Sequence, residues 1–225
     1  YLQPRSDMYG GEEVPAYDSR LEFISGFTGS AGIAIITIEK ALLFVDGRYT
    51  LQAQLQLDSN WTVMELSSDS WINWIVENTK TGNKIGYDPW LMKAKDITLL
   101  SCKINQKHSS LIPDENNLVD SMWEKRPKIF QACPKNWNKK YFTLSVENKI
   151  DQLKSNMKLE GLDALVITQP SQLCWLLNIR GNDLQYTPLF LGFLVLKVNG
   201  EVSIFSRNNK NLIKNTYKNY FYSAL

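Results

Sequence analysis

Histidine and cysteine are scarce in this 225-residue sequence, which has one histidine and three cysteines. A Ser-His-Asp triad, a Cys-His pair or a histidine-rich metal centre would have to depend on His108 alone. That residue opens the strand-like segment HSSLIP, where a structural or surface histidine is the more typical reading. The cysteines Cys102, Cys133 and Cys174 are widely spaced and form no C-x-x-C pair. This usage favours a reduced, cytoplasmic chain over a disulfide-stabilised one.

Long hydrophobic runs and charge imbalance are also missing. No apolar run approaches the roughly 18 residues that indicate a membrane span, and no secretory signal pattern opens the chain. The 25 basic and 23 acidic residues nearly cancel, which argues against a protein whose main task is to grip nucleic acid or anionic lipid. We therefore expect no nucleic-acid and no membrane partner. Hydrophobic residues make up 44% of the chain, enough for a substantial core.

The sequence contains two similar stretches, SRLEFISGFTGS at 19–30 and SQLCWLLNIRGN at 171–182. Each has the apolar spacing of a short amphipathic helix, and each leads through a loop into two apolar, β-rich runs. The second pair of runs is joined by Asn199-Gly200, a strong hairpin signal. We interpret the similarity as a divergent duplication. The opening YLQP is then expected to match the strand LDALVIT of the second unit.

Helical and β-like segments alternate through the rest of the chain, which predicts an α/β fold with a mixed sheet flanked by helices. We expect one complete unit at 1–123, a linker at 124–141 and part of a second, related unit at 142–225. The linker assignment depends on two prolines and many lysines. Further helices are expected at 48–57, 70–79, 93–106, 117–123 and 145–161, and strands at 61–66, 84–88, 108–113 and 162–168. The helix at 145–161 should bury Val146, Ile150, Leu153, Met157 and Leu159, and core positions are expected for Trp61, Trp71, Trp74 and Trp175.

The loop GFTGSAG at 26–32 is rich in glycine and hydroxyl groups, as phosphate-binding loops are. It lacks the Lys of a Walker loop. It also runs from a helix into a β-branched segment, whereas the Walker loop and the Rossmann fingerprint both run from a strand into a helix. Steric roles are the favoured alternative. Gly26 suits a left-handed helix C-cap, and Gly29 and Gly32 suit a tight turn with close backbone approach.

Several segments in register resemble one known family. SGFTGSAGIAIITIEKALLFVDGRYTLQAQLQLDSNW, ENNLVDSMWEKRP and LDALVITQPSQLCWLLNIRGNDLQYTPLF are similar to the N-terminal region of aminopeptidase P (Xaa-Pro aminopeptidase), particularly its long three-domain forms. Any one of these motifs is weak evidence, and several in the same order are strong. The resemblance covers essentially the whole chain.

The resemblance implies two creatinase-type N-terminal domains followed by a catalytic domain that lies outside this chain. The catalytic domain of the family holds two metal ions, usually manganese, and cleaves the bond before a penultimate proline. The single histidine cannot supply the metal-binding and acid–base histidines that the family implies, so we expect no metal ligands and no catalytic residues in these 225 residues. We therefore expect this part to bind no catalytic metal and to have no peptidase activity of its own. The implied partners are a peptide with proline at its second position and the chain's own C-terminal catalytic domain, and a homodimer is left open.

Three residues are candidates for substrate binding. Arg48, in VDGRY, matches the family's substrate-contacting arginine, and its guanidinium can offer paired donors to a peptide carboxylate or carbonyl. An ion pair with Asp46 is the alternative. Arg180 and Asp183, in RGND, match a loop that approaches the active site in the family. They could orient this loop by pairing with each other, and Tyr186 and Pro188 could shape the cleft wall. The alternative is a surface loop that Pro188 makes rigid.

Two other classes of protein remain open from the sequence. One is a stand-alone peptide-binding module with an inactive creatinase-type fold. The other is a nucleotide-binding α/β protein that uses GFTGSAG, for which a phosphate or nucleotide titration is the direct test.

Overall fold

The computed structural model describes residues 1–129, 134–207 and 221–224. The chain forms two compact units, and the division is not a simple cut. Residues 1–8 and 16–127 form the first unit, and residues 9–15 join 128–225 in the second. Tyr9 is buried in the second unit, where its ring packs on Phe193 with the centroids 5.0 Å apart. The sequence did not predict that residues 9–15 belong to the second unit.

The first unit is built on a six-stranded mixed sheet in the order β4-β3-β2-β1-β5-β6. The pairs β1–β2 and β2–β3 are antiparallel, and β3–β4, β1–β5 and β5–β6 are parallel. The strands are β1 (Leu2–Pro4), β2 (Gly32–Ile36), β3 (Ala41–Val45), β4 (Trp61–Glu65), β5 (Lys84–Tyr87) and β6 (Ser110–Pro113).

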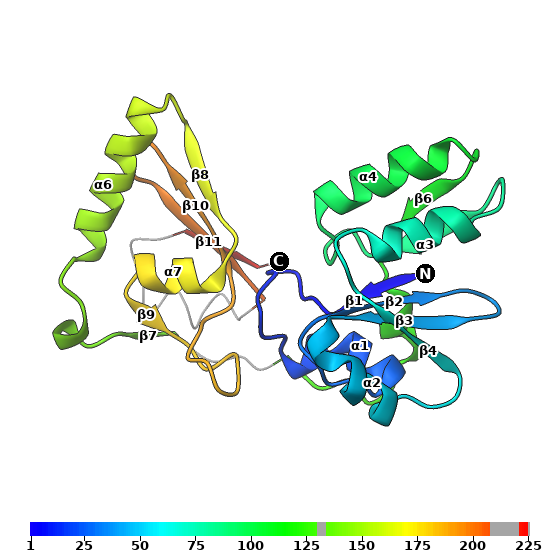
Figure 1. Cartoon of the computed structure of the whole chain (residues 1–225). Coiled ribbons are helices and arrows are strands. Elements are labelled where there is room, and N and C mark those ends of the chain that lie inside the picture. Colours follow the sequence, from blue (N-terminus) through cyan, green and yellow to red (C-terminus); the bar gives the residue numbers. More distant parts are fainter. Residues whose placement is uncertain (130–133, 208–220, 225) are drawn as a thin grey trace. The chain divides into compact units, whose positions relative to one another are not determined.

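Helices cover both faces of this sheet (Figure 1). They are α1 (Arg20–Ser25), α2 (Thr50–Gln56), α3 (Ser70–Asn78), α4 (Ala94–Asn105) and α5 (Leu118–Met122), with the short 3-10 turns η1 (Ala16–Asp18) and η2 (Gly47–Tyr49).

Strand alternation explains the two cores of the first unit. Ile33 and Ile35 of β2 face α3 and α4, where they join a cluster with Ile72 and Leu100. Ala34 points to the opposite face, into a second cluster formed with α1 and α2. Successive side chains of a strand point to opposite faces, so a strand that is buried on both sides reads as a continuous apolar run. The result is a layer of helices on each side of one sheet.

Buried charges connect the start of α1 to α5. Arg20 donates from Nε to Asp120 Oδ1 at 2.6 Å and from Nη1 to Asp18 Oδ1 at 3.0 Å. Arg126 adds an ion pair to Asp120 Oδ2 at 2.7 Å. Burial opposes ionisation of Asp120, but the hydrogen bond and charge of Arg20, with Arg126, outweigh it and hold the pKa of that carboxyl below its usual value. Removing one of these side chains would leave a buried charge without its partner, so the cluster fixes the packing of α1 on α5.

The second unit contains a four-stranded sheet in the order β12-β11-β10-β8 and a two-stranded sheet of β7 and β9. Its core gathers apolar side chains from α6, α7 and the larger sheet. Its elements are β7 (Lys135–Asn136), η3 (Lys139–Tyr141), α6 (Val146–Leu159), β8 (Ala164–Ile167), α7 (Pro170–Leu176), β9 (Ile179–Arg180), β10 (Phe193–Lys197), β11 (Val202–Ser206) and β12 (Phe221–Ala224). The expected linker therefore contributes ordered elements to the second unit from residue 128 onward, apart from 130–133, which lie outside the described residues.

The internal duplication is visible in the topology. The order β4-β3-β2-β1 repeats as β12-β11-β10-β8, with each pair of neighbours in the same relative direction. The strand β1 therefore matches β8, as the YLQP comparison predicts. The helix ends also match, because Gly26 after α1 and Asn178 after α7 both have left-handed φ values, of 77° and 50°.

Two side-chain expectations for the second unit are wrong. Trp175 is 57% exposed and Leu159 is 84% exposed, although both were expected in the core. In α7 the buried positions are Pro170, Leu173, Cys174 and Leu176, which leaves Trp175 on the open side of a two-turn helix. Leu159 is the last residue of α6 and lies beyond the end of the buried stripe. The other expected core tryptophans, Trp61, Trp71 and Trp74, pack against the cores of the first unit.

Candidate functional site

The loop GFTGSAG serves the backbone, as the steric interpretation predicts. Gly26 caps α1 with φ 77° and donates its N–H to Glu22 O at 2.7 Å. A Cβ on Gly29 would lie 2.2 Å from the Phe27 ring, so only glycine allows that ring its buried place. The loop runs from a helix end into β2, whereas phosphate loops lead into a helix N-terminus.

Arg48 lies where β3 ends, in the turn η2. Asp46 Oδ1 caps this turn by accepting from the Arg48 N–H at 3.0 Å, and it also accepts from Arg48 Nε at 2.8 Å. These hydrogen bonds from Arg48 lower the pKa of the exposed Asp46 carboxyl. The Arg48 side chain is 71% exposed and its guanidinium lies 5.4 Å from the centre of the Tyr49 ring. The Tyr49 hydroxyl is bonded to Ser30 Oγ at 2.6 Å, which ties the glycine loop to the turn that carries Arg48.

Arg180 and Asp183 have separate partners. Asp183 Oδ2 accepts from the Leu191 N–H at 2.7 Å and so holds the loop against the start of β10. Arg180 donates from Nη1 to Ile179 O at 2.7 Å, and its guanidinium lies 4.8 Å from the centre of the Trp137 ring. The ion pairs of the described residues do not include one between Arg180 and Asp183. Tyr186 is exposed, and the Pro188 carbonyl accepts from Gly181 N–H.

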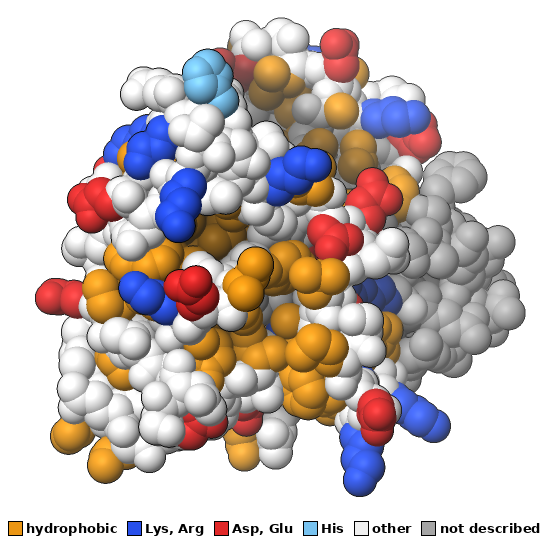
Figure 2. Space-filling model, turned by 90° about the vertical axis from the view of Figure 1, so that its right-hand side faces the viewer, with side chains coloured by type: hydrophobic (Ala, Val, Ile, Leu, Met, Phe, Trp, Pro, Cys, Tyr) orange, Lys and Arg blue, Asp and Glu red, His pale blue; other side chains and the backbone are white. Residues whose placement is uncertain are grey.

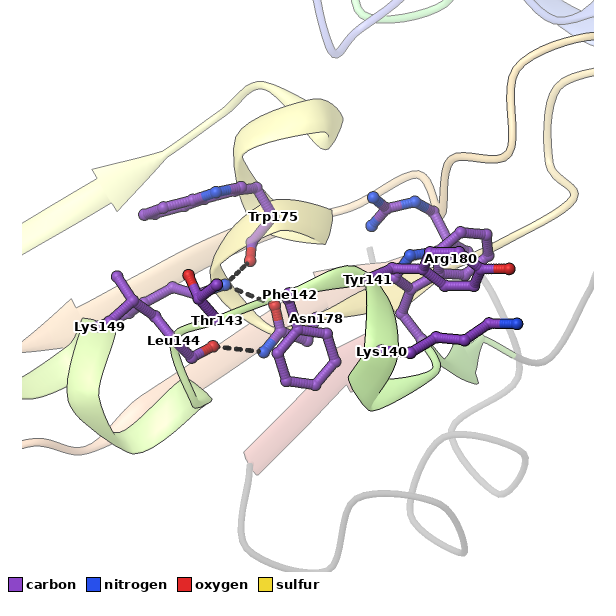
Figure 3. A pocket seen from close by; sticks show the side chains of 10 residues that line it. Lys140, Tyr141, Phe142, Thr143, Leu144, Lys149, Trp175, Asn178 and Arg180 are labelled. Atoms are coloured by element: carbon purple, nitrogen blue, oxygen red, sulfur yellow. Dashed lines mark hydrogen bonds between the residues drawn. The ribbon is translucent and has the colours of Figure 1, made fainter.

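A pocket of about 430 Å³ opens beside Arg180 in the second unit (Figure 3). We call it the basic aromatic pocket. It lies between η3, the start of α6 and the end of α7. Cations and aromatic rings make up most of its lining, contributed by Trp137, Lys140, Tyr141, Phe142, Lys149, Trp175 and Arg180.

Lys149 is the buried cation of this pocket, with 3% of its surface exposed. Its ammonium donates to the Trp175 carbonyl and to Asn178 Oδ1 and lies 4.3 Å from the centre of the Trp175 ring (Figure 3). Burial, and then the charge of Arg180, lower the pKa of this ammonium. Asn178 in turn donates from Nδ2 to Leu144 O at 3.0 Å. These bonds join the first turn of α6 to the end of α7.

One further candidate for chemistry is the single histidine of the chain. His108 is exposed at the end of α4 with φ 55°, a single-residue reversal before β6. Within the described ranges there is no group of three or more His, Cys, Asp or Glu side chains placed to hold a metal ion. On the face drawn in Figure 2, basic and acidic side chains are interspersed with hydrophobic ones. Among the described helices, none has the length and apolarity needed to cross a bilayer.

Two family models with the description "Creatinase/Prolidase N-terminal domain" match the chain, one at residues 16–122 and the other at 125–224. The chain belongs to the creatinase/prolidase N-terminal domain family. The first match includes β2 to β6 and the second includes β7 to β12, so each unit carries a match to the same domain type.

Similar proteins are Xaa-Pro aminopeptidases. The chain is 39% identical to a probable Xaa-Pro aminopeptidase P of Laccaria bicolor over 91% of its own length and 32% of that protein. It is 34% identical to Xaa-Pro aminopeptidase ApepP of Drosophila melanogaster, over 93% of its own length and 35% of that protein. The chain thus spans about a third of the length of these relatives, and it resembles their N-terminal part.

A solved structure has the same fold throughout the chain. The X-prolyl aminopeptidase of Caenorhabditis elegans, described as a cytosolic enzyme with a di-nuclear active site, aligns with a TM-score of 0.90 and 29% identity. The alignment covers 100% of this chain and 37% of that one. The mixed α/β fold of the creatinase type expected from the sequence is confirmed.

Sequence reasoning missed the pocket and its buried lysine. Lys149 lies on an amphipathic helix among polar residues, where a lysine normally faces solvent. One signal was present: Asn178 stands at the position that Gly26 holds in the first copy, and asparagine tolerates the left-handed conformation. That comparison could have located a helix end, where backbone carbonyls lack partners within the helix and can accept from a buried lysine.

Proposed function

We propose that the chain is the non-catalytic N-terminal part of a metal-dependent Xaa-Pro aminopeptidase, which removes an N-terminal residue that precedes proline. The observation that carries this proposal is the similarity to such enzymes over nine-tenths of this chain but only a third of theirs. The catalytic residues and the two metal ions, expected to be manganese, then belong to the remainder of the protein. A cytoplasmic location is the matching expectation.

In this proposal the two units cover the active-site cleft and help to position the peptide. Arg48 supports such a role because a strand end and a capped turn fix its backbone while its guanidinium stays exposed. An exposed pair with Asp46 contributes little stability, so the arginine can exchange that carboxylate for one of a peptide at small cost.

Arg180 and Asp183 are the second part of the proposed substrate contact. Asp183 holds the RGND loop to the segment before β10 by accepting from the Leu191 N–H. Arg180 is half-buried, and its guanidinium lies over the Trp137 ring. The loop therefore has a fixed base and presents donors, which is what positioning a peptide requires.

The test is peptide cleavage by the full-length protein with manganese. We expect Arg48→Ala to lower kcat/KM for Xaa-Pro peptides about tenfold, as the loss of one charged hydrogen bond to substrate would. Lys40→Ala is the matched control, since Lys40 is an exposed cation on the β2–β3 turn. Equal kinetics of Arg48→Ala and Lys40→Ala would remove Arg48 from the substrate site.

A second measurement separates the enzyme from a stand-alone peptide-binding module. The 225-residue chain with manganese should release no N-terminal residue from Xaa-Pro peptides, and the full-length protein should do so. A full-length protein that binds these peptides without cleaving them would favour the module instead.

A further inference from the structure

The basic aromatic pocket concentrates positive charge. Its lining includes Lys140, Lys149 and Arg180, and no acidic side chain lines it among the described residues. The whole chain is nearly neutral, so three cations around one cavity depart from the average surface. Such a site raises the local concentration of anions.

Exposed aromatic rings gather at the same place. Trp137, Tyr141 and Trp175 all have more than a third of their surface exposed, although buried positions are usual for such rings. The rings of Trp137 and Tyr141 lie 5.3 Å apart. Arg180 lies over the first ring at 4.8 Å and Lys140 over the second at 4.8 Å. The cations are therefore held in place by ring faces that also border the cavity.

The pocket has a fixed floor. The buried Lys149 ammonium is held by Trp175 O and Asn178 Oδ1, and Asn178 is bonded to Leu144 on the opposite wall. A buried cation with neutral partners keeps a positive potential, and among the described residues no carboxylate forms an ion pair with Lys149. The volume of about 430 Å³ is within the range of small-ligand sites.

We propose that the basic aromatic pocket binds a small organic anion whose charged group lies next to a ring, with the C-terminal carboxylate of a short peptide as its ligand. Arg180 and Lys140 would hold the carboxylate, and Trp137 and Tyr141 would contact an aromatic or proline ring beside it. The fork of an arginine matches the two oxygens of a carboxylate. The choice of a peptide as the source of the carboxylate rests on the proposed function, whereas the anion-and-ring chemistry follows from the pocket alone.

The experiment is calorimetric titration of the 225-residue chain with acetyl-Gly-Phe and with its C-terminal amide. The amide has the same ring and lacks the charge. We expect saturable binding of the acid in the millimolar range or tighter, binding of the amide at least about tenfold weaker, and weakening of the acid by added salt. Adenosine monophosphate and inorganic phosphate are titrated in the same way, and both should bind more weakly than acetyl-Gly-Phe.

Variants assign the binding to this pocket. Arg180→Gln should weaken the acid about tenfold, and Lys140→Gln, at an exposed side chain, several-fold. Lys158→Gln removes an equal charge from the exposed surface of α6 outside the pocket and should leave affinity unchanged. Each variant is accepted only if its thermal transition matches the wild type.

The outcomes are distinct. Equal affinity for acid and amide, or no saturation, overturns the anion site. Equal affinity of Arg180→Gln, Lys140→Gln and Lys158→Gln places the binding elsewhere and also overturns it. Tighter binding of adenosine monophosphate than of the acid overturns the peptide source. None of these measurements needs peptidase activity, so a full-length protein that fails to cleave Xaa-Pro peptides would leave this result standing.

Discussion

Asn178 offers a sharp test of how the second unit is held together, because its backbone and its side chain contribute separately. The residue follows α7 with φ 50°. Its side chain bonds to Leu144 O and to the buried Lys149 ammonium. We expect both Asn178→Gly and Asn178→Ala to destabilise the second unit, with the alanine variant the less stable of the two.

The magnitudes follow from the contacts. Losing the neutral bond to Leu144 O costs about 1 kcal/mol, and losing the charged bond from Lys149 about 1.5–3 kcal/mol. Asn178→Gly should therefore lower the free energy of unfolding by about 2.5–4 kcal/mol. In Asn178→Ala the alanine must also adopt the left-handed conformation, which costs a residue with a Cβ ~1–2 kcal/mol more than it costs glycine. Gly26, the equivalent residue of the first unit, has no side chain, and a Cβ there meets only Gln56 O at 3.5 Å. Gly26→Ala should thus cost only the conformational ~1–2 kcal/mol, and Gly26→Asn less.

The assay is native-state hydrogen exchange read by mass spectrometry, which reports the opening free energy of each unit's core amides separately. Substitutions at Asn178 should change protection in β10 and β11, and those at Gly26 in β2 and β3. Wild-type protection in Asn178→Gly would refute the account of its side chain. A Gly26→Asn variant as unstable as Gly26→Ala would refute the equivalence of the two helix ends.

Two further predictions concern packing and pH. Gly29→Ala should destabilise the first unit by about 1–3 kcal/mol in urea unfolding, since its Cβ would overlap the Phe27 ring. Gly47→Ala is the control, because nothing lies within 4 Å of the added Cβ, and its stability should lie within about 0.5 kcal/mol of the wild type. Equal effects of the two substitutions would contradict the overlap. Burial raises the pKa of the Cys174 thiol from 9.0 to about 11. As the pH rises, the thiol loses its proton in the unfolded state before it does in the folded state. The free energy of unfolding should therefore fall between pH 9 and pH 11 by up to about 2.7 kcal/mol more in the wild type than in Cys174→Ala. Parallel plots of unfolding free energy against pH for the two proteins would contradict the raised pKa.

Local signals in the sequence are enough to predict most of the fold. The period-2 and helical patterns locate the strands and helices, Gly26 marks a helix end, and Asn199-Gly200 joins β10 to β11, with Gly200 at φ 94°. The duplication adds a check, because the same strand order must appear twice. These features depend on residues a few positions apart, so the sequence exposes them directly.

The parts that could not be predicted depend on distant partners. Lys149 is buried because carbonyl and amide oxygens at the end of α7, 26 and 29 residues away, accept from it. Arg20 meets Asp120 across 100 residues. For Arg48, Arg180 and Asp183, the structure gives the local partners, and their roles toward substrate stay predictions. Local pattern carries no information on which charged groups will meet, so their burial becomes visible only with tertiary structure.

Residues 9–15 belong to the second unit although the residues on both sides of them belong to the first, and this has a consequence for synthesis. Tyr9 leaves the ribosome long before its partner Phe193, yet both ends of its segment are anchored in the first unit. The first unit can therefore complete its own core early, as domains do during translation, while presenting Tyr9 on a closed loop. That loop already has a low entropy of ordering when the second unit emerges, since its two ends are fixed only a few residues apart. Cutting the chain near residue 128 would deprive the second unit of this segment, so the two units are poor candidates for separate expression at a single boundary.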